Sequence, residues 1–101
     1  MDLGKSIKDT RKKLGIKQNY LAEITGLSQT YLSQIENNVK EPNLSTLKLI
    51  CEHINIPLPV LFFISIDTQD IKPEKQIAFN HLKPSINSMI LEFFDNKIMN
   101  D

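Results

Sequence analysis

QNYLAEITGLSQTYLSQIEN, residues 18–37, has the pattern of two short helices that meet at a tight turn. Gly26 can adopt the positive φ angle that such a turn demands, and Ala22 is small enough to let the helices cross closely. Ser28 is a good N-terminal cap for the second helix. The apolar residues that we expect to form the shared core are Leu21, Leu27, Leu32 and Ile35. The stretch therefore predicts a compact helical hairpin.

The second helix of this hairpin carries a polar outer face. Glutamine and asparagine amides can make paired hydrogen bonds to adenine edges, and serine and threonine hydroxyls can reach bases or phosphates. A helix face that is merely solvated would more often carry glutamate and lysine. The polar residues are Ser28, Gln29, Thr30, Ser33, Gln34 and Asn37. This composition favours a DNA-reading face over an ordinary helical hairpin.

Around the hairpin, the sequence predicts an all-α fold of five short helices. A first helix begins near Leu3 and ends at Gly15, and Asn43 can cap a fourth helix. Pro57 and Pro59 mark the start of a fifth helix, which runs to about residue 63. The apolar stripe expected on the fourth helix is Leu44, Leu47, Ile50, Cys51 and Ile54. We therefore expect a DNA-binding domain over residues 1–64.

The remainder of the chain reads as a linker, residues 65–72, and a helical extension, residues 73–101. Pro73 can open one helix and Pro84 another. The second of these helices has an apolar face, too hydrophobic to leave exposed, made of Ile86, Met89, Ile90, Phe93 and Phe94. Either it folds back on its own domain or it pairs with a second copy. We favour a homodimer, because a dimer doubles the length of DNA that is read.

The charge of the chain is zero overall but is unevenly distributed. Residues 5–17 hold six basic residues against the single Asp9, a net charge of +5, whereas residues 64–101 hold four lysines and six acidic residues. Such an asymmetry indicates either an anion-facing surface or a solvated helix face. On charge alone we favour the solvated face.

Several functional classes have no support in the sequence. The longest apolar run, residues 60–64, is far shorter than the roughly 18 residues of a membrane helix, and no secretory signal opens the chain. We expect a cytoplasmic protein without a membrane partner. Cys51 is alone, and His53 and His81 lack zinc-site spacing. With no glycine-rich phosphate loop or nucleophile motif, we expect no enzyme, no cofactor and no metal.

The sequence resembles the Cro/cI-type, or XRE-family, helix-turn-helix transcriptional regulators. The resemblance covers residues 3–63, and the motifs that carry it are Leu14-Gly15-Ile16, Gln18, Leu21-Ala22, Gly26, Leu27-Ser28, residues 32–37, Glu41-Pro42-Asn43-Leu44 with Leu47, and Leu61-Phe62. It implies a five-helix, lambda-repressor-like domain that binds double-stranded DNA. Lys17 and Pro57 stand where the family often has a capping serine or threonine.

The resemblance also implies roles for individual residues. The residues that it implies for base contacts in the major groove are Ser28, Gln29, Thr30, Ser33 and Gln34. The residues that it implies for contacts to the DNA backbone are Gln18, Lys17, Tyr31, Asn37, Asn38 and Lys40. Arg11 and Glu36 occupy positions that form a structural ion pair in some members.

These observations predict a sequence-specific transcription regulator, more specifically a repressor. We expect a homodimer on a palindromic operator whose half-sites lie about 34 Å apart. The alternative is a protein-binding regulator, such as an antitoxin, whose C-terminal helices grip a partner protein.

Overall fold

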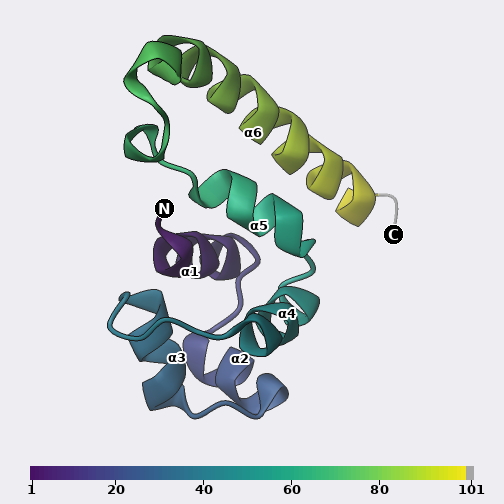
Figure 1. Cartoon of the computed structure of the whole chain (residues 1–101). Helices are drawn as coiled ribbons and strands as arrows, with labels where there is room; N and C mark the ends of the chain where they lie inside the picture. The colour runs from purple at the N-terminus through teal and green to yellow at the C-terminus, as the bar shows by residue number, and fades with distance from the viewer. Residues whose placement is uncertain (100–101) are drawn as a thin grey trace. The chain divides into compact units, whose positions relative to one another are not determined.

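The computed structural model describes the backbone of residues 1–99 and the side chains of residues 1–92. Within residues 1–99 every regular element is a helix, which confirms the predicted all-α class. The chain divides into two compact units, Met1–Ile66 and Asp67–Asp101. The helices of the first unit are α1 (Leu3–Lys13), α2 (Gln18–Thr25), α3 (Gln29–Glu36), α4 (Leu44–His53) and α5 (Leu58–Ser65) (Figure 1).

Side-chain caps begin three of these helices. Ser28 Oγ accepts a hydrogen bond from Tyr31 N at 3.0 Å, and Asn43 Oδ1 accepts one from Thr46 N at 2.8 Å. The Asp2 carboxylate accepts one from Lys5 N at 3.0 Å. Each cap satisfies an amide that has no partner within its own helix. Asp2 as a cap was not among the expectations, although a polar residue just before a periodic apolar segment is a start signal.

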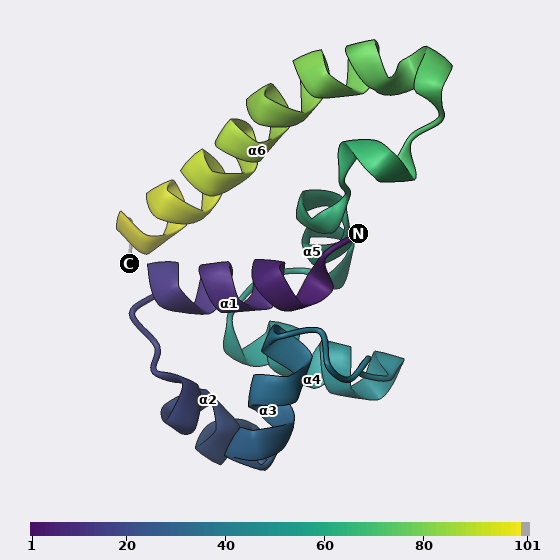
Figure 2. The same cartoon turned by 90° about the vertical axis from the view of Figure 1, so that its left-hand side faces the viewer.

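The core of the first unit is formed by all five of its helices. α1 packs against α3 and α5, α2 packs against α3 and α4, and α4 packs against α5 (Figure 2). Gly26, between α2 and α3, has a φ angle of 73°, as the tight turn requires. Leu44, expected in the apolar stripe of α4, is 54% exposed, because it occupies the first helical position, beside the cap. The largest fully buried side chains are Ile7, Leu21, Leu32, Ile35, Ile50, Ile54 and Leu61.

The second unit contains two 3-10 turns, η1 (Thr68–Asp70) and η2 (Pro73–Lys75), followed by α6 (Gln76–Met99). Thr68 Oγ1 donates to Asn80 Oδ1 at 2.8 Å, which ties η1 to α6. Gln76 Nε2 donates to the carbonyl of Ile71 at 2.9 Å. The segment between α5 and α6 is therefore structured rather than a plain polar linker. Ser65, assigned to that linker, is instead the buried last residue of α5.

The expectation of two helices in the C-terminal extension was wrong. Pro84 lies inside α6, which is continuous over 24 residues (Figure 1). A proline inside a helix removes one backbone hydrogen bond, at a cost of about 3 kcal/mol, yet α6 continues through Pro84. A proline start signal was therefore mistaken for a helix boundary. The side chains of Phe93 and Phe94 lie outside the described residues.

No single helix within the described backbone is both long and apolar enough to cross a membrane. Only α4 and α5 taken together reach the required length and composition, and they are bent by 100° at their junction.

Candidate nucleic-acid interface

The polar face of α3 is the most prominent candidate surface. Ser28, Gln29 and Thr30 are exposed at the N-terminal end of the helix, whereas Ser33 and Gln34 are half-buried one turn later. The opposite side of the helix is buried. One short helix therefore presents all five residues that were expected to contact bases.

A buried ion pair anchors the back of α3 to α1. Arg11 Nε lies 2.8 Å from Glu36 Oε2, and Arg11 Nη2 donates to Glu36 Oε1 at 3.0 Å. Arg11 Nη1 also donates to the carbonyl of Ile16 at 2.8 Å. Arg11 is 6% exposed and Glu36 is 3% exposed. The pair is therefore desolvated, and its paired, two-point geometry holds the C-terminal end of α3 in a defined orientation.

Gln18, at the start of α2, extends this network toward the exposed face. Its Nε2 donates to Glu36 Oε1 at 3.1 Å, and its Oε1 accepts a long, 3.5 Å contact from Gln29 Nε2. The side chain expected to contact phosphate is thus occupied inside the domain. Polar contacts run from the buried Arg11 through Glu36 and Gln18 to Gln29. These contacts end at Gln29, a residue that was expected to read bases.

The residues expected to contact the DNA backbone lie on both sides of α3. Lys17 precedes α2 and is exposed, and Lys40 is exposed in the turn after α3. Tyr31 is half-buried on α3 itself. Asn37 is exposed, although its Nδ2 donates to the carbonyl of Ser33 at 2.9 Å. Lys17, Asn37 and Lys40 are therefore accessible to solvent on the two sides of α3.

Asn38, also expected to contact the DNA backbone, is exposed and makes two hydrogen bonds within the domain. Its Nδ2 donates to Asp2 Oδ1 at 2.7 Å, and its Oδ1 accepts from Gly4 N at 3.2 Å. These internal hydrogen bonds occupy the amide that was expected to face the DNA backbone. The hydrogen bond from Asn38, with that from Lys5 N, lowers the pKa of the Asp2 carboxyl. Sequence reasoning missed this pairing because it joins residues 36 positions apart.

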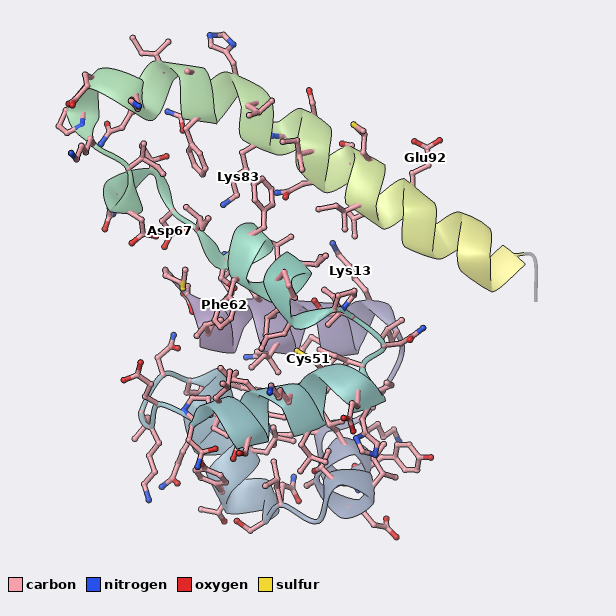
Figure 3. All side chains as sticks on the ribbon, turned by 45° about the vertical axis from the view of Figure 1, so that its right-hand side comes forward. Lys13, Cys51, Phe62, Asp67, Lys83 and Glu92 are labelled. Carbon is pink, nitrogen blue, oxygen red and sulfur yellow. The ribbon has the colours of Figure 1, made fainter. Side chains whose placement is uncertain are left out.

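The basic segment, residues 5–17, does not form one face. Arg11 is buried in its ion pair, whereas Lys12 and Lys13 are exposed. Figure 3 shows Lys13 leaving α1 on the side away from α2 and α3. The net charge of this segment therefore overstates the positive charge available beside α3.

The other chemistry-bearing residues do not assemble a second site. Cys51 is 4% exposed and points into the interior (Figure 3), and burial raises the pKa of its thiol to about 11. A protonated, buried thiol is a poor nucleophile. Among the side chains of residues 1–92, no three histidine, cysteine or carboxylate groups gather as metal ligands.

The chain belongs to the helix-turn-helix family, whose model matches residues 7–61. It is thus an XRE-type, DNA-binding transcription regulator by family, as the sequence predicted.

Two relatives come from Bacillus phage phi105. The ImmF control region 10 kDa protein is 48% identical over 59 residues, which cover 58% of this chain and 66% of that protein. The Immunity repressor protein is 31% identical over 80 residues, which cover 79% of this chain and 53% of that protein. The chain therefore spans between half and two-thirds of the length of these relatives.

A solved structure shows the same fold. The biofilm regulator SinR, solved in complex with DNA, matches with a TM-score of 0.57 and 31% identity. The match covers 59% of this chain and 97% of the SinR chain. The likeness extends over most of the SinR chain in that complex.

Proposed function

We propose that this protein is a sequence-specific repressor of transcription that inserts α3 into the major groove of DNA. The observation that carries the proposal is the exposed polar start of α3, backed by the buried Arg11–Glu36 pair. A helix that is fixed from behind and polar in front suits base recognition, because recognition helices present their N-terminal residues to base edges. The names of the immunity repressor and of the SinR–DNA complex support the same function.

In this proposal the contacts divide into two groups. The side chains that face base edges are Ser28, Gln29, Thr30, Ser33 and Gln34. Lys17, Lys40, Asn37 and Tyr31 contact the sugar-phosphate backbone and set the register. Gln18 acts chiefly by holding Gln29, since its own amide is bound to Glu36. The place of action is the cytoplasm, where the DNA of such a regulator would lie.

We further propose that α6 pairs two copies of the chain. Phe79, Leu82, Ile86 and Met89 follow alternating spacings of three and four residues, the repeat of a coiled-coil seam. Leu82 is 56% exposed and Met89 is 66% exposed, so this face has unburied apolar surface. A two-fold dimer would place two copies of α3 on successive turns of one DNA face and so read a palindromic operator.

The second candidate function is that of a protein-binding regulator such as an antitoxin. The same exposed side chains, Leu82 and Met89, favour it, because a different protein could cover them. The two candidates predict different solution masses for the purified chain. A dimer favours the operator-binding homodimer, and a monomer favours the heterologous partner.

The direct test is selection of DNA by the full chain from a library of random duplexes. We expect an inverted repeat to be enriched. Gln29→Ala should weaken binding to the selected duplex by about 1–3 kcal/mol, measured by fluorescence anisotropy at fixed salt. Gln69→Ala, the same change at an exposed position on η1, is the matched control and should bind as the unaltered protein does. If Gln29→Ala loses equal affinity for selected and random duplexes, Gln29 does not contact bases.

A further inference from the structure

The turn after α3, residues 37–40, is tied to the beginning of α1. Asn38 supplies both links: its Nδ2 donates to Asp2 Oδ1 at 2.7 Å, and its Oδ1 accepts from Gly4 N at 3.2 Å. We call Asp2, Gly4 and Asn38 the N-terminal clasp. None of the DNA contacts proposed above uses these hydrogen bonds.

The backbone around the clasp is tightly constrained. Asn38 has a φ angle of 59°, in the left-handed region that most residues avoid and asparagine tolerates. A Cβ atom added at Gly4 would lie 2.4 Å from the carbonyl oxygen of Ile35 and 2.8 Å from that of Glu36. The first turn of α1 therefore lies directly against the last turn of α3, and only glycine permits this approach.

Asp2 is itself held from two further directions. Its backbone N–H donates to the carbonyl of Ser65, at the end of α5, at 2.9 Å. Its carboxylate also accepts from Lys5 N at 3.0 Å. Asp2 thus joins the beginning of α1 to the end of α5, so Asn38 is bound to a fixed point of the fold. Figures 1 and 2 also show the beginning of α1 beside the end of α5.

The turn that the clasp holds leads directly to the proposed phosphate contacts. The backbone N–H groups of Val39 and Lys40 both donate to the carbonyl of Gln34, at 2.8 and 3.2 Å. The side chains of Asn37 and Lys40, on either side of this turn, are exposed. A change in the Asn38 backbone would move Lys40, which follows it, relative to α3, whereas Asn37 is held on α3 by its own hydrogen bond to the carbonyl of Ser33.

We propose that Asn38 is a positioning residue for DNA binding: it does not touch DNA but, through Asp2 and Gly4, fixes the turn that presents Lys40 to phosphate. The inference rests on the proposed DNA-binding function. It assigns the N-terminal residues of the chain, which lie outside the helix-turn-helix, a share in aligning that motif.

The test is an exchange of side chains within the clasp. Asn38→Asp places two carboxylates against each other, and it should weaken binding to the selected duplex by roughly tenfold. The double variant Asp2→Asn with Asn38→Asp restores the hydrogen bond with its donor and acceptor reversed. It also keeps the net charge and the acceptor for Gly4 N. Because Asp2 Oδ1 accepts from both Asn38 Nδ2 and Lys5 N, the exchange removes the cap on Lys5 N, at a cost in stability that Asp2→Asn alone measures. We expect the double variant to recover affinity to within about threefold of the original.

The exchange separates positioning from direct contact. If Asn38 touched a phosphate, a carboxylate at position 38 would repel DNA in both variants, and the double variant would not recover. Such a failure, with both variants folded at the assay temperature by circular dichroism, would overturn the inference. Wild-type affinity in Asn38→Asp would overturn it as well.

Two further variants complete the design. Asn55 also has a positive φ angle, 55°, and follows α4, so Asn55→Asp is the matched control and should change affinity by less than about twofold. If Asn38→Asp does not fold, Asn38→Gly keeps access to the backbone conformation but lacks the amide. Wild-type affinity in that variant would overturn the inference. A full chain that selects no duplex at all would instead refute the proposed function itself.

Discussion

The two units of this chain bury their apolar residues to very different extents. In the first unit, Ile7, Leu32 and Ile50 are each fully buried within the packed helices. In the second unit, Ile77 is 75% exposed, Leu82 is 56% exposed and Met89 is 66% exposed. The first unit therefore has a closed apolar core, although Val39 and Leu44 are exposed on its surface, whereas none of the described apolar side chains of the second unit is fully buried. The second unit thus carries apolar surface that a further surface could cover.

This contrast suits two different functions, base recognition by the first unit and association with another molecule by the second. A recognition helix must be rigid, because base readout depends on placing hydrogen-bonding groups to within fractions of an ångström. The first unit obtains that rigidity from a buried core and the Arg11–Glu36 pair. A helix that associates with another molecule needs the opposite property, exposed apolar side chains on one face.

The largest effect is expected from Glu36→Ala, in the interior of the first unit. The substitution leaves the guanidinium of Arg11 buried without its counter-charge and removes the acceptor of Gln18. We expect the free energy of unfolding to fall by about 3–5 kcal/mol, measured by urea denaturation. Glu52→Ala, on the exposed side of α4, should change it by less than about 0.5 kcal/mol. A loss below 1 kcal/mol for Glu36→Ala would show that the pair does not hold the unit together.

The interior of the first unit was largely predictable from sequence. The hairpin around Gly26, the caps at Ser28 and Asn43 and the core side chains follow from helical periodicity and turn chemistry, which are local signals. The Asp2–Asn38 pairing was not, because it depends on how α1 meets the end of α3. The hydrogen bond from Gln18 to Glu36 was not predictable either, because these residues are 18 positions apart.

The second unit was harder to predict. Pro84 is compatible with either a helix start or a helix interior, and local sequence does not separate the two. The periodicity of α6 indicates an apolar face but not its occupant, since a folded-back domain, a second copy and another protein would all bury it.

Removal of the second unit should have the next largest effect. A chain of residues 1–66 retains the first unit, including the hydrogen bond from Asp2 N to the carbonyl of Ser65. We expect it to keep its unfolding temperature but to be monomeric by light scattering, whereas the full chain is a dimer. Its affinity for a two-half-site duplex should fall by about a hundredfold, because the second half-site is no longer tethered. A monomeric full chain would contradict the homodimer and favour a heterologous partner.

A matched pair of leucines tests the contrast at single residues. Leu82 on α6 is 56% exposed, and Leu44 at the start of α4 is 54% exposed. Leu82→Ser should raise the dissociation constant of the dimer by about 10–100-fold, because about half of a leucine side chain's burial energy is lost in each of the two copies. Leu44→Ser should leave it unchanged, since only α6 is proposed to pair. The dissociation constants are measured by analytical ultracentrifugation. Equal effects of the two substitutions would contradict the assignment of the dimer contact to α6.

The smallest effect concerns Cys51, in the core of the first unit. Burial raises the pKa of its thiol from 9.0 to about 11, so the folded chain keeps the proton to a higher pH than the unfolded chain does. Between these values the unfolded chain binds fewer protons, and the stability from this group must therefore fall as pH rises. At pH 10 the loss relative to pH 8 should be about 1 kcal/mol. The measurement is urea denaturation at both values, with Cys51→Ala as the reference, because lysine and tyrosine titration is common to both proteins. The same loss in Cys51→Ala would show that the thiol does not contribute. Dimer dissociation should be unaffected by the substitution, because the cysteine belongs to the unit that buries its own core.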